Sequence, residues 1–346
     1  MKRIFIFLLF LPLVACSNKN DRKKQTAEQD ELADQGYELI TEANIFFQPL
    51  SSVEIEEPDP AAVELGKYLF YDTRLSGEGN ISCNSCHNLN TYGVDNERFS
   101  PGDAEGTVGN RNSPTVLHAA LHKMQFWDGR AETVEEQAAG PILNPIEHNI
   151  KDEQELVDRL KEVDRYHELF AEAYGDEGIT FDNVLHAIGA FERTLLPESA
   201  FDKFLEGDNS ALNDQQKRGL RVFIDAGCIT CHSGVTLGGQ MLQKFGLYRD
   251  YWTATESETI DLGLYEISEN ERDKYLFKVP GLRNIEHTWP YFHDGSVEEL
   301  DRAVEIMVEL QTTAELSEAE IDDMVAFLNS LSADVPEDVK QSPFEQ

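Results

Sequence analysis

The chain has 346 residues, of which 40% are hydrophobic and 27% are charged. This composition is typical of a globular protein with about two domains, and it excludes a wholly disordered chain. There are 29 Lys and Arg residues against 65 Asp and Glu residues, a formal net charge of −36. So acidic a surface repels phosphate and excludes nucleic acid as a partner; it would attract a basic protein, or it only keeps the protein soluble.

The first 15 residues have the pattern of an export signal. Lys2 and Arg3 precede an apolar run over 4–14, which is too short to span a bilayer comfortably and fits a signal-peptide core. The run ends in Leu-Val-Ala-Cys, which resembles a bacterial lipobox, whose Cys becomes the lipidated first residue of the mature chain. We predict a lipoprotein signal peptide over 1–15 and a periplasmic protein anchored to the outer membrane only through Cys16. Ordinary secretion is the alternative.

The next segment, 16–45, is mostly polar and charged and is predicted to be a flexible tether. The rest of the chain has the apolar spacing of helices and no run of alternating strand residues, so a mainly α fold is expected. Helices are predicted over 152–174 and 181–196, over a segment that Asn213 caps and that runs to Ala226, and after the capping box Ser317 to Glu320.

Four cysteines besides Cys16 form two Cys-x-x-Cys-His sequences, the c-type haem attachment pattern. Two thiols at this spacing can add to the two vinyl groups of one haem, and the adjacent His then binds the iron. A disulfide or a zinc site needs no His after the second Cys, and a thioredoxin-like pair usually sits in a βαβ context. The motifs predict two covalently bound haems, held by Cys83, Cys86 and His87 and by Cys228, Cys231 and His232.

The two halves of the chain form a weak repeat. Each half has a helix, the Cys motif and a Pro-containing segment that ends in Phe-x-Asp-Gly, at 126–129 and at 292–295. Trp127 and His293 occupy equivalent places in the two copies. The repeat predicts two cytochrome c-like helical domains with one haem each, an N-terminal domain over 46–198 and a C-terminal domain over 199–335.

Several ordered motifs between about 61 and 331 resemble those of the bacterial di-haem cytochrome c peroxidases and, more broadly, their superfamily with MauG. The resemblance implies an enzyme that reduces hydrogen peroxide to water with electrons from a small periplasmic cytochrome c or cupredoxin. Members of the family are commonly dimers, which suggests a homodimer by analogy. The matching segments are 65–70, 81–89, 111–120, 125–131, 140–147, 278–284 and 290–296.

The resemblance also implies roles for single residues in the reactive first haem pocket. Glu147 matches the acid that moves a proton between the two oxygens of a bound peroxide. Gln137 and Pro141 match positions that line the same pocket. Trp127 matches the Trp between the two haems, which is expected to carry electrons between them; a large core residue is the alternative interpretation.

The second haem is implied to be the electron-transfer haem, with Met307 as the axial ligand opposite His232. A thioether ligand raises the potential and blocks peroxide, which suits an electron relay. Met307 also lies at helical spacing from Leu300 and Val304, so a core role is the alternative. The family further holds a calcium ion between its domains, and the matching ligands are the Asn112 side chain and the carbonyls of Thr288 and Pro290.

One position departs from the pattern. Many members carry a loop His that caps the first iron in the oxidised resting state, and Asp103 stands there in this chain. We therefore predict a first haem that is open at rest, unless a neighbouring His118, His122 or His148 substitutes. A MauG-like enzyme that oxidises a protein or organic substrate, and a non-catalytic di-haem electron carrier, are the alternatives to the peroxidase.

Overall fold

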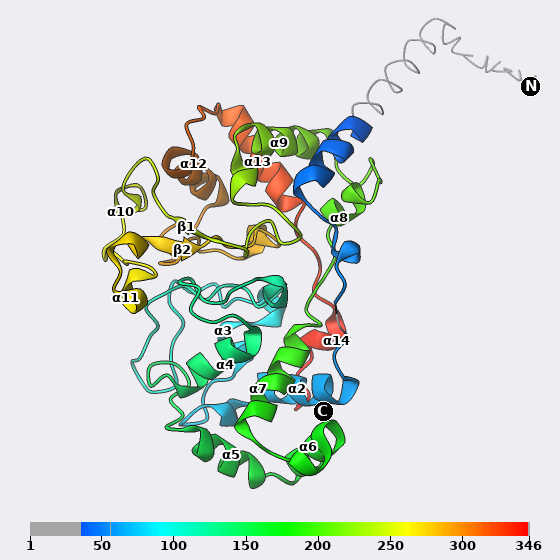
Figure 1. Cartoon of the computed structure of the whole chain (residues 1–346), viewed down its shortest axis with the longest axis vertical. Helices are drawn as coiled ribbons and strands as arrows, with labels where there is room; N and C mark the ends of the chain where they lie inside the picture. Colours follow the sequence, from blue (N-terminus) through cyan, green and yellow to red (C-terminus); the bar gives the residue numbers. More distant parts are fainter. Residues whose placement is uncertain (1–35, 56, 345–346) are drawn as a thin grey trace, which may run out of the picture.

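The structure is a computed structural model that describes residues 36–55 and 57–344, and it is mainly helical, as predicted (Figure 1). The predicted signal peptide, the lipidated Cys16 and the tether as far as residue 35 lie outside the described residues. None of the helices in the described part is long and apolar enough to cross a membrane.

Apart from the two ends of the chain, the lower half of the molecule in Figure 1 is built from the first part of the chain and the upper half from the second part. The helices of the lower half are α2 (Pro60–Tyr71), α3 (Cys83–Cys86), α4 (Val134–Leu143), α5 (Glu153–Lys161), α6 (Asp164–Tyr174) and α7 (Phe181–Glu192). Those that follow are α8 (Ala200–Leu205), α9 (Asp214–Asp225), α10 (Tyr251–Ala254), α11 (Tyr265–Ser268), α12 (Leu300–Gln311), α13 (Glu318–Asn329) and α14 (Glu337–Lys340).

The sheet structure is a single antiparallel pair of short strands in the described part of the chain. These are β1 (Leu242–Lys244) and β2 (Leu276–Lys278), in which Leu242 pairs with Lys278 and Lys244 with Leu276. The pair lies in the half of the molecule that carries α10 to α13, facing the other half (Figure 1). Short 3₁₀ helices include η4 (Ala119–Leu121), η6 (Cys228–Thr230) and η8 (Ile285–His287).

The predicted helix starts are confirmed by their capping bonds. The Asn213 side chain accepts from Gln216 N at 2.9 Å at the start of α9, and Ser317 N donates to the Glu320 carboxylate at 2.8 Å at the start of α13. The single helix predicted over 152–174 is wrong, because the chain forms α5 and α6 there. Val163 between them is extended (φ −111°, ψ 110°), but the apolar spacing continues through it, so periodicity does not show the break. The helix predicted over 181–196 ends at residue 192.

Both halves are built on the same close crossing of two helices. A Cβ on Gly66 in α2 would lie 1.9 Å from the Ala187 carbonyl oxygen in α7. A Cβ on Gly219 in α9 would lie 1.8 Å from the Asp323 carbonyl oxygen in α13. Each glycine therefore lets two helix backbones touch, and the two helices that carry these glycines, α2 and α9, each precede a Cys-x-x-Cys-His motif. The repeat seen in the sequence is thus also a repeat in packing.

Each end of the described chain packs against the domain that is distant from it in sequence. The predicted domain limits at 45 and 335 do not anticipate this packing. Residues 36–46 are helical rather than part of a flexible tether, and their buried Leu39 packs in one core with Phe201 and Phe327. The backbone N–H of Leu50 donates to the Asp202 carboxylate at 2.9 Å, which ties this segment to the C-terminal domain.

The other end of the chain does the reverse. Val335 packs in one cluster with Phe70 and Phe191 of the N-terminal domain. The hydroxyl of Tyr71 donates to the Val339 carbonyl at 2.8 Å, so α14 lies beside α2 in the lower half (Figure 1). Each terminal segment thus buries its apolar side chains against the domain that is distant in sequence.

Candidate functional site

A cavity of about 440 Å³ lies in the N-terminal domain beside the first Cys motif. Short helix α3 places the two cysteines of this motif in the wall of the cavity, and neither forms a disulfide. Burial raises the pKa of both thiols, that of Cys86 to about 11, which disfavours the thiolate form that binds a metal ion. Burial also lowers the pKa of His87 and so favours the neutral imidazole that binds iron. The donor set therefore fits a c-type haem.

The predicted pocket residues meet in this cavity. Gln137 and Pro141 project from α4, and Glu147 lies in the turn that follows this helix; all three line the cavity. The side chain of Asn144 accepts from Ile146 N at 3.0 Å and shapes that turn. Burial raises the pKa of Glu147, while the nearby Arg130 acts in the opposite direction. A carboxyl whose pKa is raised by burial holds a proton more readily than an ordinary Glu, which suits a group that accepts a proton and then returns it.

Asp103 is buried and does not line the cavity. Its carboxylate accepts hydrogen bonds from the backbone N–H groups of Glu78 at 2.6 Å and Asn80 at 3.3 Å. Its own N–H donates to the Glu147 carbonyl at 2.8 Å. Asp103 therefore joins two loops to the segment that carries Glu147, in a position where its side chain cannot serve as a ligand in the cavity.

The three histidines considered as substitutes have other contacts. His118 does not line the cavity, and its Nε2 donates to the Pro197 carbonyl at 3.0 Å. His148 lines the cavity, and its Nδ1 donates to the Leu75 carbonyl at 3.0 Å. His122 lines the cavity at its border with the C-terminal domain. Whether one of them caps an iron stays a prediction.

The second Cys motif lies at η6, after α9. Nδ1 of the buried His232 donates to the Leu237 carbonyl at 3.0 Å. This bond fixes the proton on Nδ1 and leaves the Nε2 lone pair to bind iron. Met307 lies half-buried in α12, and its pairing with His232 stays a prediction.

The two Phe-x-Asp-Gly copies meet at the domain interface. The rings of Trp127 and His293 are 6.3 Å apart in an edge-to-face arrangement. Trp127 and His293 are 166 positions apart in the sequence, and Asn112 and Lys278 are separated by the same number. Asn112 N donates to the His293 carbonyl at 2.7 Å, and Lys278 N donates to the Trp127 carbonyl at 2.6 Å. The interface is therefore reciprocal, and it places the indole of Trp127 between the two motif-bearing domains.

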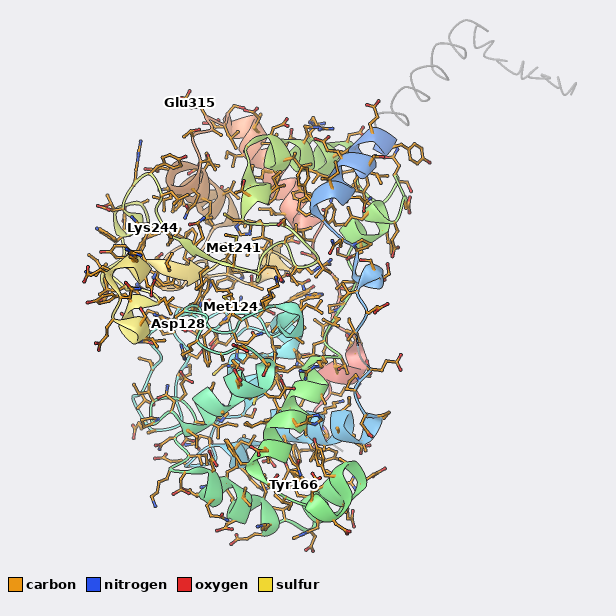
Figure 2. The ribbon with its side chains drawn as sticks, viewed as in Figure 1. Met124, Asp128, Tyr166, Met241, Lys244 and Glu315 are labelled. Atoms are coloured by element: carbon orange, nitrogen blue, oxygen red, sulfur yellow. The ribbon has the colours of Figure 1, made fainter. Side chains whose placement is uncertain are left out.

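A buried ionic cluster closes one side of this interface. Arg111 binds Asp261 of the C-terminal domain with two bonds of 2.7 and 2.9 Å and also donates to Asp128 at 2.5 Å. Arg130 donates to the same Asp128 carboxylate at 2.7 Å. Figure 2 shows Asp128 at the border between the two halves. The guanidinium groups of Arg111 and Arg130 thus both bind the Asp128 carboxylate.

The predicted calcium ligands lie at the same interface. Nδ2 of Asn112 donates to the Glu97 carbonyl at 2.9 Å, so the side-chain oxygen of Asn112 points away from Glu97. Asn96 Nδ2 reaches across to the Trp289 carbonyl at 2.7 Å, between Thr288 and Pro290. Over residues 36–55 and 57–344, no three His, Cys, Asp or Glu side chains form a metal site. The predicted ligands are instead an amide oxygen and two backbone carbonyls, which calcium also accepts. Calcium binding stays a prediction.

Sequence reasoning missed two charged residues in the cavity wall. Glu192 in α7 is buried, and burial raises its pKa to about 8. Lys278 in β2 is only 4% exposed. A charged residue is usually exposed, so only the three-dimensional structure shows that these two are buried.

Two His sites with paired thiols, in two helical domains, define a di-haem c-type cytochrome. The sequence profile described as di-haem cytochrome c peroxidase matches residues 60–210, and that of cytochrome c matches residues 216–332. The chain is 43% identical to the cytochrome c551 peroxidase of Nitrosomonas europaea, over 86% of this chain and 87% of that protein. It is 34% identical to the methylamine utilization protein MauG of Methylophilus methylotrophus, over 82% of this chain and 87% of that protein.

A solved structure agrees with this assignment. A MauG-like protein associated with microbial copper homeostasis superposes with a TM-score of 0.75 at 28% identity, covering 86% of this chain and 97% of that one. The chain therefore belongs to the di-haem cytochrome c peroxidase family, with haem c as its cofactor. The predicted family, fold class and haem type are confirmed.

Proposed function

We propose that the protein is a cytochrome c peroxidase that reduces hydrogen peroxide, with two electrons and two protons, to two water molecules. One observation carries the proposal: the same cavity is lined by Cys83, Cys86 and His87 and by Glu147. The identity of 43% to a relative named cytochrome c551 peroxidase supports it. The named relatives also make hydrogen peroxide the expected substrate.

Each residue of the first pocket has a part in this reaction. Cys83 and Cys86 would hold the haem covalently, and His87 would bind its iron. When bound, the haem supplies a redox-active iron at which a peroxide can be cleaved. Glu147 accepts a proton from one peroxide oxygen and returns it to the other, and Gln137 helps to orient the peroxide. Trp127 provides the path for electrons between the domains, because its ring touches His293 of the other repeat.

The C-terminal domain supplies the electrons. Cys228 and Cys231 would hold the second haem, and His232 and Met307 would bind its iron. Calcium held by Asn112, Thr288 and Pro290 would brace the interface between the domains. A small basic cytochrome c or cupredoxin is the proposed donor, since the net charge of −36 attracts a cation-rich surface.

The location and assembly of the protein are also proposals. The Lys-Arg start, the apolar run and Cys16 support export to the periplasm with a lipid anchor in the outer membrane. A homodimer is proposed by analogy with the family. Size-exclusion chromatography with light scattering, and mass analysis of the mature N-terminus, test both.

The first haem is proposed to be open in the oxidised resting state. Asp103 stands where many members carry a capping His, and its carboxylate is held by two backbone N–H groups outside the cavity. Cyanide should therefore bind the fully oxidised protein without prior reduction. An oxidised-state spectrum with only low-spin bis-His and His/Met haems would contradict this proposal.

A steady-state assay separates the candidate functions. A peroxidase consumes peroxide with a reduced small cytochrome, and the loss of two cytochrome electrons for each peroxide is the expected result. The MauG-like alternative has support in the 34% identity to MauG, and it would instead require a protein or organic substrate. An electron carrier would show neither reaction.

A further inference from the structure

Lys278 is a buried amine that lacks a carboxylate partner. It lies in β2, is 4% exposed and lines the cavity of the first Cys motif, although it belongs to the C-terminal domain. Among the described residues its ammonium forms no ion pair, and its one hydrogen bond joins it to Nδ1 of His122 at 3.5 Å. A buried ammonium without a counter-charge is costly, so a partner from outside the protein chain is expected.

The neighbouring acid cannot fill this role. Asp128 is the carboxylate that acts on Lys278 most directly, but it already accepts from Arg111 at 2.5 Å and from Arg130 at 2.7 Å. Arg111 is in turn bound to Asp261. Glu266 also lies 3.5 Å from Arg111, so the carboxylates of this cluster pair with the two arginines and none forms an ion pair with Lys278.

The surroundings of His122 show that the pair is built into the interface. A Cβ on Gly239 would lie 2.2 Å from the His122 ring, and one on Gly281 would lie 2.9 Å from its Nε2. Both glycines come from the C-terminal domain, so they make room for a ring of the N-terminal domain next to Lys278. Burial and the charge of Lys278 lower the pKa of His122, which keeps the ring neutral.

We propose that Lys278, with His122, binds a carboxylate side chain of the haem in the first cavity. Haem carries two propionate groups at its edge, and these are the anions that its binding would bring into the cavity. The first cofactor site would then be incomplete without the C-terminal domain. Since Lys278 N also donates to the Trp127 carbonyl at 2.6 Å, the same residue would join the haem edge to the Trp between the domains. This inference rests on haem binding in the cavity, not on peroxide turnover.

The test measures the midpoint potential of each haem in the holoprotein by spectroelectrochemical titration. Lys278→Met removes the charge and keeps an unbranched apolar stem. Lys244→Met is the matched control, because Lys244 is an exposed lysine of the paired strand, in the upper half of Figure 2. The potential of the first haem should fall in Lys278→Met, since an unneutralised carboxylate favours the oxidised iron. Lys278→Arg, which keeps the charge, should restore most of the shift.

Equal potentials of the first haem in Lys278→Met and Lys244→Met would overturn the proposal. If Lys278→Met does not mature, Lys278→Gln takes its place. The wild-type protein gives a second measurement: its resonance Raman propionate-bending band should lie at the frequency of a hydrogen-bonded propionate. A band at the frequency of a water-exposed propionate would refute the contact. Peroxide consumption is assayed separately, so failure of this proposal is distinct from failure of the peroxidase function.

Discussion

Glu147→Gln tests the proposed proton transfer directly. The substitution keeps the size of the side chain and removes its ability to accept and return a proton. The effect depends on whether another carboxylate in the cavity can replace Glu147. The other acids in the lining are Asp128, Glu192 and Glu266.

None of these acids is suited to the replacement. Two guanidinium groups bind Asp128, and Glu266 lies 3.5 Å from Arg111. Burial raises the pKa of Glu192 to about 8, which reduces at neutral pH the share of the carboxylate form that a proton acceptor needs. The full contribution of general acid–base catalysis should therefore be lost, a fall of about 10³-fold in the rate with peroxide, or about 4 kcal/mol.

The assay is stopped-flow mixing of the half-reduced protein with hydrogen peroxide, followed by the absorbance of the reduced haem. Glu105→Gln is the matched control, because Glu105 is an exposed acid of a neighbouring loop that does not line the cavity. The wild-type rate should also fall as the pH drops through the pKa of Glu147, which burial raises, because only the carboxylate accepts the proton. A rate in Glu147→Gln within a few-fold of that in Glu105→Gln would refute the reasoning.

Further predictions concern stability and the donor. Gly66→Ala should lower the free energy of unfolding by about 3 kcal/mol, because its Cβ would lie 1.9 Å from the Ala187 carbonyl oxygen; Gly109→Ala, with 3.7 Å of room, should change it little in urea unfolding. Asp202→Asn should cost about 3–5 kcal/mol, since it leaves Arg283 buried without its bidentate partner; an unchanged midpoint would contradict this. The pKa of Asp202 is lowered from 3.8 to about 2, so about 2 kcal/mol of stability present above pH 3.8 should be lost as the pH falls towards 2. Turnover with a basic cytochrome should decrease with added salt, and turnover with a small neutral reductant should not; equal salt dependence would argue against charge steering.

The residues of the first pocket could be found from the sequence because each belongs to a short motif. Cys83, Cys86 and His87 are adjacent, and Glu147 follows Pro141 by less than two helical turns, so local spacing and family resemblance located them. The structure places them in one cavity. The helix starts at Asn213 and Ser317 could be predicted for the same reason, because a cap depends on three or four consecutive residues.

Contacts between residues that are far apart in the chain could not be predicted from the sequence. Leu50 binds Asp202, and Tyr71 binds Val339, across 152 and 268 positions; no local pattern marks such pairs. Lys278 is charged and lies in a short strand, so its burial follows only from the reciprocal packing of the two repeats. The break at Val163 was missed because apolar spacing is the same in one helix and in two consecutive ones.

In the proposed function, an iron held at His87 reacts with peroxide while the domain of His232 supplies an electron. The most direct measurement is a titration of the half-reduced holoprotein with hydrogen peroxide, monitored by the visible band of the reduced second haem. One equivalent of peroxide should abolish that band, and the wild-type spectrum of the first haem should change in the same mixing step. Persistence of the reduced band after several equivalents, with an unchanged first haem, would contradict the account.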